Sequence, residues 1–214
     1  MGFPELYKPY NDQLIAEIGL DWFEVRDTLT QMQNGPGLYP DTALFLVEVI
    51  KRLDVSSIVE FGSGASTLFI AKACQKFGKS FTSLEEMPRY QAITQQLLDI
   101  YKVDFKVDLF GEVASMLIPE ADLLFLDSLP DSRISFLDHE SVNINNFKYI
   151  LLDDAEDPQY YCPVARQLGK VDRWNNYMFN PIGRQDRSLL INCKDPTFNI
   201  NEWCWSWKPA KVFW

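Results

Sequence analysis

Acidic side chains stand at the ends of several apolar, strand-like segments of this sequence. They are Glu85, Asp127, Asp153 and Asp154. A carboxylate can accept hydrogen bonds from sugar hydroxyls, bind a cation or take up a proton during a reaction. Any one of them could be a solvated strand end. In an open α/β sheet, however, ligands bind beyond the carboxyl ends of the strands, so we expect these acids to surround one crevice.

The segment EFGSGAST (60–67) joins a strand-like run to a helical one through two glycines. Gly62 and Gly64 would let a ligand, or the chain itself, approach the backbone where a side chain would collide. Glu85 stands at the tip of the next predicted strand. There its carboxylate can accept hydrogen bonds from both ribose hydroxyls of an adenosine-containing ligand.

Two residues of this segment decide between adenosine-containing ligands. Glu60 would repel the pyrophosphate of a dinucleotide, and Thr67 replaces the third glycine of the dinucleotide-binding pattern. S-adenosylmethionine has no phosphate, and its ammonium and sulfonium cations favour an acidic surrounding. We therefore predict S-adenosylmethionine as the cofactor. A dinucleotide remains the alternative.

The elements that must position these residues alternate between strand and helix. Predicted strands cover 56–62, 80–86, 104–110, 121–128 and 147–155, and helices cover 66–77 and the segment from Pro88. This alternation indicates a parallel sheet with helices on both faces. Two later strands, 173–179 and 187–193, are joined by so short a turn that they must pair antiparallel. The fold class is thus a Rossmann-like, mostly parallel seven-stranded sheet with an antiparallel terminal hairpin.

EFGSGAST resembles motif I of the class I S-adenosylmethionine-dependent methyltransferases. FTSLEEMPRYQAITQQLLDIYKV is similar to the corresponding stretch of catechol O-methyltransferase and its relatives. The resemblance implies that Glu85 rather than Glu86 binds the ribose. It also implies that the stretch 111–119 lines the adenine through Glu112, Val113 or Ser115. The predicted cofactor-binding residues are Glu60, Gly62, Ser63, Gly64, Ser66, Thr67, Glu85, Val113 and Asp127.

The resemblance also matches Asp127 and Asp154 to two acids that hold Mg²⁺ in catechol-type enzymes together with an adjacent Asn. Here Ala155 stands in place of that Asn, so a third ligand is missing unless Asp153, Glu156 or Asp157 replaces it. We therefore favour a metal-free site in which Asp127 and Asp154 are the catalytic acids. The single histidine, His139, lies in a predicted helix and is expected to have a surface or capping role.

Composition limits the partners of the protein. The 214 residues carry a formal net charge of −10 and no long basic cluster, so we expect a small-molecule acceptor and no nucleic acid. No apolar run is long enough to span a membrane, and no signal peptide is apparent, so we expect a cytoplasmic protein. The four cysteines show no metal-binding spacing and are expected to be reduced.

We predict three regions along the chain. Residues 1–40 form a helical extension or lid, 41–195 the cofactor-binding domain, and 196–214 an aromatic tail packed on it. The tail holds Trp203, Trp205, Trp207, Phe213 and Trp214, which could alternatively cover the acceptor pocket or form a homodimer contact. The function we predict is O- or N-methylation of a small molecule. The alternatives are an NAD(P)-binding oxidoreductase and a non-catalytic binding module.

Overall fold

The structure is a computed structural model of the chain. It describes residues 3–32, 34–35, 37–109, 119–139, 142–155, 157–159, 162 and 166, together with the backbone of three strands nearer the C-terminus. The chain divides into two compact units, Met1–Ser56 with Ser63–Leu109, and Ser57–Gly62 with Phe110–Trp214. Each unit is described by itself below.

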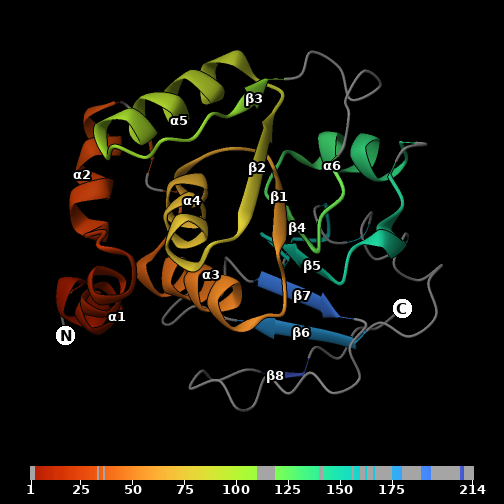
Figure 1. The fold of residues 1–214 in the computed structure, drawn as a ribbon, viewed down its shortest axis with the longest axis horizontal. Coiled ribbons are helices and arrows are strands. Elements are labelled where there is room, and N and C mark those ends of the chain that lie inside the picture. Colours follow the sequence, from red (N-terminus) through yellow and green to blue (C-terminus); the bar gives the residue numbers. More distant parts are fainter. Residues whose placement is uncertain are drawn as a thin grey trace. The chain divides into compact units, whose positions relative to one another are not determined.

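The first unit contains five helices and a pair of parallel strands (Figure 1). The elements are α1 (Phe3–Ile18), α2 (Trp22–Gln31), α3 (Pro40–Arg52), α4 (Ala65–Phe77), β2 (Ser80–Glu85), α5 (Pro88–Ile100) and β3 (Asp108–Leu109). Helix α3 packs against both α1 and α4. Its apolar residues, such as Leu44, Phe45 and Val47, are almost completely buried and form the core of this unit.

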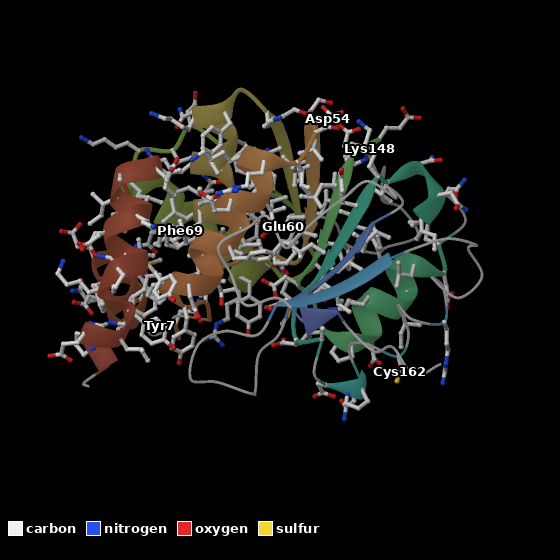
Figure 2. The ribbon with its side chains drawn as sticks, turned by 90° about the horizontal axis from the view of Figure 1, so that it is seen from below. Tyr7, Asp54, Glu60, Phe69, Lys148 and Cys162 are labelled. Atoms are coloured by element: carbon white, nitrogen blue, oxygen red, sulfur yellow. The ribbon has the colours of Figure 1, made fainter. Side chains whose placement is uncertain are left out.

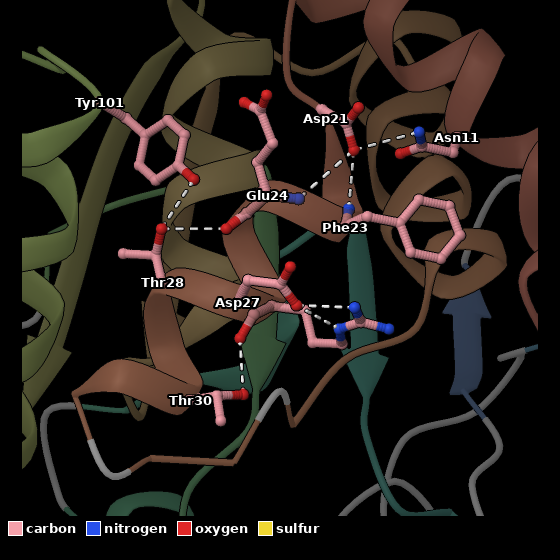
Figure 3. A network of polar contacts seen from close by, with 9 residues as sticks. Asn11, Asp21, Phe23, Glu24, Asp27, Thr28, Thr30 and Tyr101 are labelled. Carbon is pink, nitrogen blue, oxygen red and sulfur yellow. Dashed lines mark hydrogen bonds and ion pairs between the residues drawn. The ribbon is translucent and has the colours of Figure 1, made fainter.

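Local signals in the sequence mark the start of α2 and the end of α4. Asp21 accepts hydrogen bonds from the backbone N–H groups of Phe23 and Glu24 at the start of α2, and from the side chain of Asn11 in α1 (Figure 3). At the end of α4, Gly78 adopts the left-handed conformation that favours glycine. The predicted stop of this helix at Gly78 is confirmed.

The second unit contains six of the described strands. They are β1 (Ser57–Phe61), β4 (Leu123–Leu126), β5 (Tyr149–Leu152), β6 (Asn175–Phe179), β7 (Leu189–Cys193) and β8 (Lys208–Pro209), with helix α6 (Pro130–Leu137) and a short 3₁₀ helix (Ile144–Asn146). The strands lie in the order β1-β4-β5-β7-β6-β8. Pairs β1–β4 and β4–β5 are parallel, and their side chains are almost all buried.

The predicted alternation of strands and helices is confirmed, and β6 and β7 pair antiparallel as expected. Three details of the prediction were wrong. The third strand is only Asp108–Leu109 rather than 104–110, a further short strand, β8, pairs with β6, and α6 ends at Leu137, so His139 follows the helix in a turn. In the predicted third strand, Asp104, Lys106, Asp108 and Leu109 are exposed, so burial does not support a longer strand there.

Two further expectations can be compared with the described residues. Within these ranges, no helix combines the length and apolar character needed to cross a lipid bilayer. Cys74 is buried and Cys162 exposed, and both are free thiols. The aromatic residues of the predicted tail, including Trp203, Trp205, Trp207, Phe213 and Trp214, lie outside the described residues.

Candidate active site

In the first unit, Glu85 is buried at the end of β2 and is held by the glycine turn. Its Oε2 accepts hydrogen bonds from the backbone N–H of Ser63 at 2.7 Å and from the Ser63 hydroxyl at 2.9 Å. Its Oε1 accepts one from the backbone N–H of Met87 at 2.8 Å. Glu85 is 4% exposed, whereas Glu86 is half-buried. The structure therefore places Glu85, rather than Glu86, against the glycine turn.

These contacts limit how Glu85 can bind a ribose. A carboxylate offers about four acceptor positions, and three are already used by protein donors. Two ribose hydroxyls therefore cannot both be accepted unless the Ser63 hydroxyl turns away. Thr94 Oγ1 lies 3.2 Å from that hydroxyl and is an alternative partner for it.

The two glycines of the turn have different roles. A Cβ on Gly64 would meet no other atom within 4 Å, and the φ angle of −180° is extended backbone that any residue can adopt. The backbone conformation therefore does not require a glycine at position 64. The space beside Gly64 is open, and that is where a ligand could approach the turn.

Gly62 is required by the protein itself. Its φ angle is +96°, and a Cβ there would lie 2.5 Å from the backbone oxygen of Asp127 and 2.7 Å from the backbone nitrogen of Ser128. A side chain at position 62 would push the end of β1 away from the segment after β4. We expect Gly62→Ala to lower the free energy of unfolding by roughly 2 to 4 kcal/mol, from left-handed strain and overpacking. Urea unfolding measures this, and a loss below 0.5 kcal/mol, about the size of a neutral surface change, would contradict it.

Ser66 and Thr67, at the start of α4, are buried in the first unit. Thr67 Oγ1 accepts a hydrogen bond from the backbone N–H of Gly64 at 2.9 Å and is itself fully buried. The hydroxyl of Thr67 therefore caps the helix and fixes the conformation of the turn. Direct cofactor contacts of both residues stay predictions. Residues Glu112, Val113 and Ser115 lie outside the described residues.

In the second unit, three acids meet at the ends of β4 and β5. Carboxylate oxygens of Asp127, Asp153 and Asp154 all lie within 4.8 Å of one another. Backbone hydrogen bonds at the strand ends bring the acids together. The Asp127 N–H donates to Phe61 O, and the Asp153 N–H donates to Leu126 O. The expected proximity of Asp127 and Asp154 is confirmed. Of the three acids that could replace the missing third ligand, Asp153 lies beside Asp127 and Asp154. Asp157 instead accepts a hydrogen bond from the backbone N–H of Gln159, and Glu156 lies outside the described residues.

Crowding of these acids changes their proton affinity. Burial, followed by the nearby charges of Glu60 and Asp154, raises the pKa of Asp127 to about 6, although Arg133 and a hydrogen bond from Asp153 oppose the shift. Burial and the charge of Asp127 raise the pKa of Asp153 well above its ordinary value. A side-chain hydrogen bond joins Asp153 to Asp127, and it raises the pKa of Asp153 and lowers that of Asp127. Asp127 is left ionised above pH 6.

Glu60 and Arg133 surround the acids in the second unit. Glu60, on β1, is fully buried and acts on Asp127 through its charge (Figure 2). Arg133, on α6, is also fully buried and donates hydrogen bonds to the backbone oxygens of Ser128 and Asp153. Arg133 could not be predicted from the sequence, because an arginine in the segment LPDSR looks like any exposed residue near the start of a helix.

Solved structures with the same architecture are methyltransferases. An O-methyltransferase of Bacillus cereus in complex with SAH is 15% identical and superposes with a TM-score of 0.60, covering 89% of this chain and 99% of that one. The chain has the fold of the O-methyltransferases. An SAH-bound methyltransferase of Podospora anserina shows 18% identity and a TM-score of 0.57, with 91% and 98% of the two chains covered.

The same fold occurs in the SAM-bound O-methyltransferase TomG of Streptomyces achromogenes, which is involved in tomaymycin synthesis. It is 12% identical, with a TM-score of 0.61 and with 90% of this chain and 99% of that one covered. No protein-family model and no curated protein sequence matches the chain. The comparisons therefore agree on a Rossmann-like O-methyltransferase fold, and the catalytic role must be argued from the residues.

Proposed function

We propose that the protein is an S-adenosylmethionine-dependent methyltransferase that methylates an oxygen or nitrogen atom of a small molecule. The observation that carries this proposal is the contact between buried Glu85 and the turn at Ser63, beside the open space at Gly64. A carboxylate at this position suits a ribose, and the acids of the second unit suit a cationic cofactor. The O-methyltransferase fold supports the same conclusion.

The proposal includes the arrangement of the sheet and the roles of three regions of the chain. The sheet is mostly parallel and contains the antiparallel hairpin of β6 and β7. Residues 1–40 form a lid or extension, 41–195 the catalytic domain, and 196–214 an aromatic cover or homodimer contact. The net charge of −10 supports a small-molecule acceptor over a nucleic acid, and the protein acts in the cytoplasm.

S-adenosylmethionine, when bound, supplies a methyl carbon that is already activated for in-line displacement. The chain has to align the acceptor and remove its proton. Asp127 is suited to accept that proton, because its pKa of about 6 leaves it ionised at neutral pH yet closer to neutrality than an ordinary aspartate. Asp154 lies beside it and would orient the acceptor.

Carboxylate oxygens of Asp127, Asp153 and Asp154 lie within 4.8 Å of one another, so Asp153 could supply the ligand that Ala155 cannot. The observation that favours a metal-free site is Arg133, whose fully buried guanidinium already brings positive charge beside the acids. Mg²⁺ prefers several ionised or neutral oxygen ligands in an octahedron. We therefore propose a metal-free reaction.

This proposal predicts that a chelator leaves methyl transfer unchanged. Activity should stay within about twofold when EDTA is added and when Mg²⁺ is then supplied in excess, since no metal takes part in the transition state. The measurement is transfer of a labelled methyl group to a panel of phenols, catechols and amines. Activity that EDTA removes and Mg²⁺ restores would refute the metal-free site, and the absence of transfer to any acceptor in the panel would count against the broader assignment.

Glu85→Ala is expected to weaken binding of S-adenosylhomocysteine by about 1.5 to 3 kcal/mol, the usual effect of losing hydrogen bonds to a charged acceptor. This corresponds to roughly a 10- to 150-fold higher Kd, measured by calorimetry. Glu86→Ala is the matched control and should change the Kd by less than about twofold. Unchanged binding in a folded Glu85→Ala protein, or a larger loss in Glu86→Ala, would exclude the ribose role of Glu85.

A further inference from the structure

Arg133 stands where helix α6 would be expected to carry an apolar side chain. The buried face of this helix includes Arg133, Phe136 and Leu137, at the spacing of one helical stripe. Phe136 packs on Phe61 of β1, with ring centroids 4.4 Å apart. The Arg133 side chain is fully buried, and burial of an arginine is costly unless its charge and donors are used. Its position therefore calls for a specific role.

The hydrogen bonds of Arg133 continue the connection between β4 and β5 beyond the end of their ladder. The paired register of these strands ends at Leu126 and Leu152. Past that point, Arg133 Nε donates to Ser128 O at 2.6 Å and Nη1 donates to Asp153 O at 2.7 Å. Ser128 directly follows Asp127, and Asp153 directly precedes Asp154. One planar guanidinium thus links the backbone next to each candidate catalytic acid.

Both hydrogen bonds are accepted by backbone carbonyl groups, so they leave the acid carboxylates available to a substrate. The positive charge of Arg133 nevertheless acts on Asp127 and on its neighbour Asp153, and it lowers the pKa of both against the larger effect of burial. A rigid guanidinium can fix two acceptors in space in a way that a lysine, with its single nitrogen, cannot. The geometry and the charge of Arg133 therefore meet at Asp127.

We propose that Arg133 is a positioning residue for methyl transfer, which clamps the ends of β4 and β5 and so holds Asp127 and Asp154 together. The role of Arg133 in positioning the acids for methyl transfer rests on the proposed function. The clamp itself, with its charge coupling to the acids, does not depend on which reaction the protein catalyses.

A double-mutant cycle on stability tests the clamp. Arg133→Met and Arg133→Lys are each made in the wild-type protein and in an Asp127→Asn/Asp154→Asn background, which keeps the side-chain shapes and removes their charge. The urea midpoint of unfolding is measured at pH 7.5. Arg133→Met should lower the midpoint clearly in the wild type, and by about half as much or less in the background without the acids. Arg133→Lys should retain more of the wild-type midpoint than Arg133→Met.

Lys148 provides the matched control. It pairs with Asp122 at 3.2 Å, at the opposite ends of the same two strands (Figure 2). Lys148→Met should shift the midpoint equally in both backgrounds. If Arg133→Met proves too unstable to purify, the Arg133→Lys cycle gives the same comparison, because the lysine loses one of the two bridging bonds.

An Arg133→Met midpoint equal to that of the wild type would overturn the clamp, because the two backbone hydrogen bonds would then contribute nothing. Equal midpoint shifts for Arg133→Met in the two backgrounds would overturn the charge coupling between Arg133 and the acids. With a methyl acceptor in hand, Arg133→Lys should lower kcat at least tenfold while the Kd for S-adenosylhomocysteine changes less than about threefold. An unchanged kcat in a protein that shows the coupling would refute the positioning role alone. Failure of the wild type to bind S-adenosylhomocysteine would instead refute the proposed function and leave the clamp to the stability cycle.

Discussion

Gly64→Val is expected to abolish measurable binding of S-adenosylhomocysteine while the protein stays folded. The added side chain would occupy the open space beside the turn, where no protein atom lies within 4 Å of a Cβ. The φ angle of −180° is extended backbone, so valine introduces no left-handed strain. We expect the Kd to rise by at least about 100-fold, and the free energy of unfolding to change by less than about 1 kcal/mol.

Calorimetry and urea unfolding of the same preparation measure both quantities. Gly62→Ala is the contrasting variant, because it is expected to act first on stability. If Gly64→Val binds S-adenosylhomocysteine like the wild type, the cofactor does not approach the backbone at this turn. A Gly64→Val protein that fails to fold would show that the turn at position 64 serves packing instead.

Asp127→Asn is expected to lower kcat for methyl transfer by about 10² to 10⁴, the usual contribution of a general base. The amide keeps the size of the side chain but cannot take up the proton of the acceptor. The Kd of the Asp127→Asn protein for S-adenosylhomocysteine should change much less than its kcat. Full activity in both Asp127→Asn and Asp154→Asn would remove these acids from the mechanism.

The pKa of about 6 also predicts how activity and stability respond to pH. Activity that needs ionised Asp127 should rise with pH through about 6 and level off above it. Stability should move the other way, because the folded protein binds this proton more tightly than the unfolded chain does. The contribution of Asp127 to the free energy of unfolding therefore falls as pH rises from about 4 to about 6. Asp127→Asn should remove both dependences, and a pH–rate profile unchanged by the substitution would contradict the assignment.

The order of elements could be predicted from the sequence because its signals are local. The buried β-branched run before Gly62, the Gly78 stop of α4 and the proline at the start of α5 each act within a few residues. The short third strand was predicted too long. Its residues Asp108 and Leu109 are exposed, and apolar pattern alone does not show where pairing ends.

The candidate site was predictable in position but not in its contacts. Acids at strand ends and glycines in a turn are visible in the sequence, so Glu85, Asp127 and Asp154 could be named. The sequence does not show that Asp153 and Asp127 interact, because this depends on side-chain distances between the ends of two strands. The role of Arg133 depends on which face of α6 is buried, and that only packing decides.

Calorimetric titration of the wild-type protein with S-adenosylhomocysteine and, separately, with NAD⁺ tests the central claim most directly. We predict saturable one-to-one binding of S-adenosylhomocysteine and no measurable binding of NAD⁺, because buried Glu60 precedes the turn and would repel a pyrophosphate. Binding of NAD⁺ without S-adenosylhomocysteine would indicate an oxidoreductase, and binding of neither would indicate that the fold serves another purpose. Either of these results would contradict the assignment as a methyltransferase.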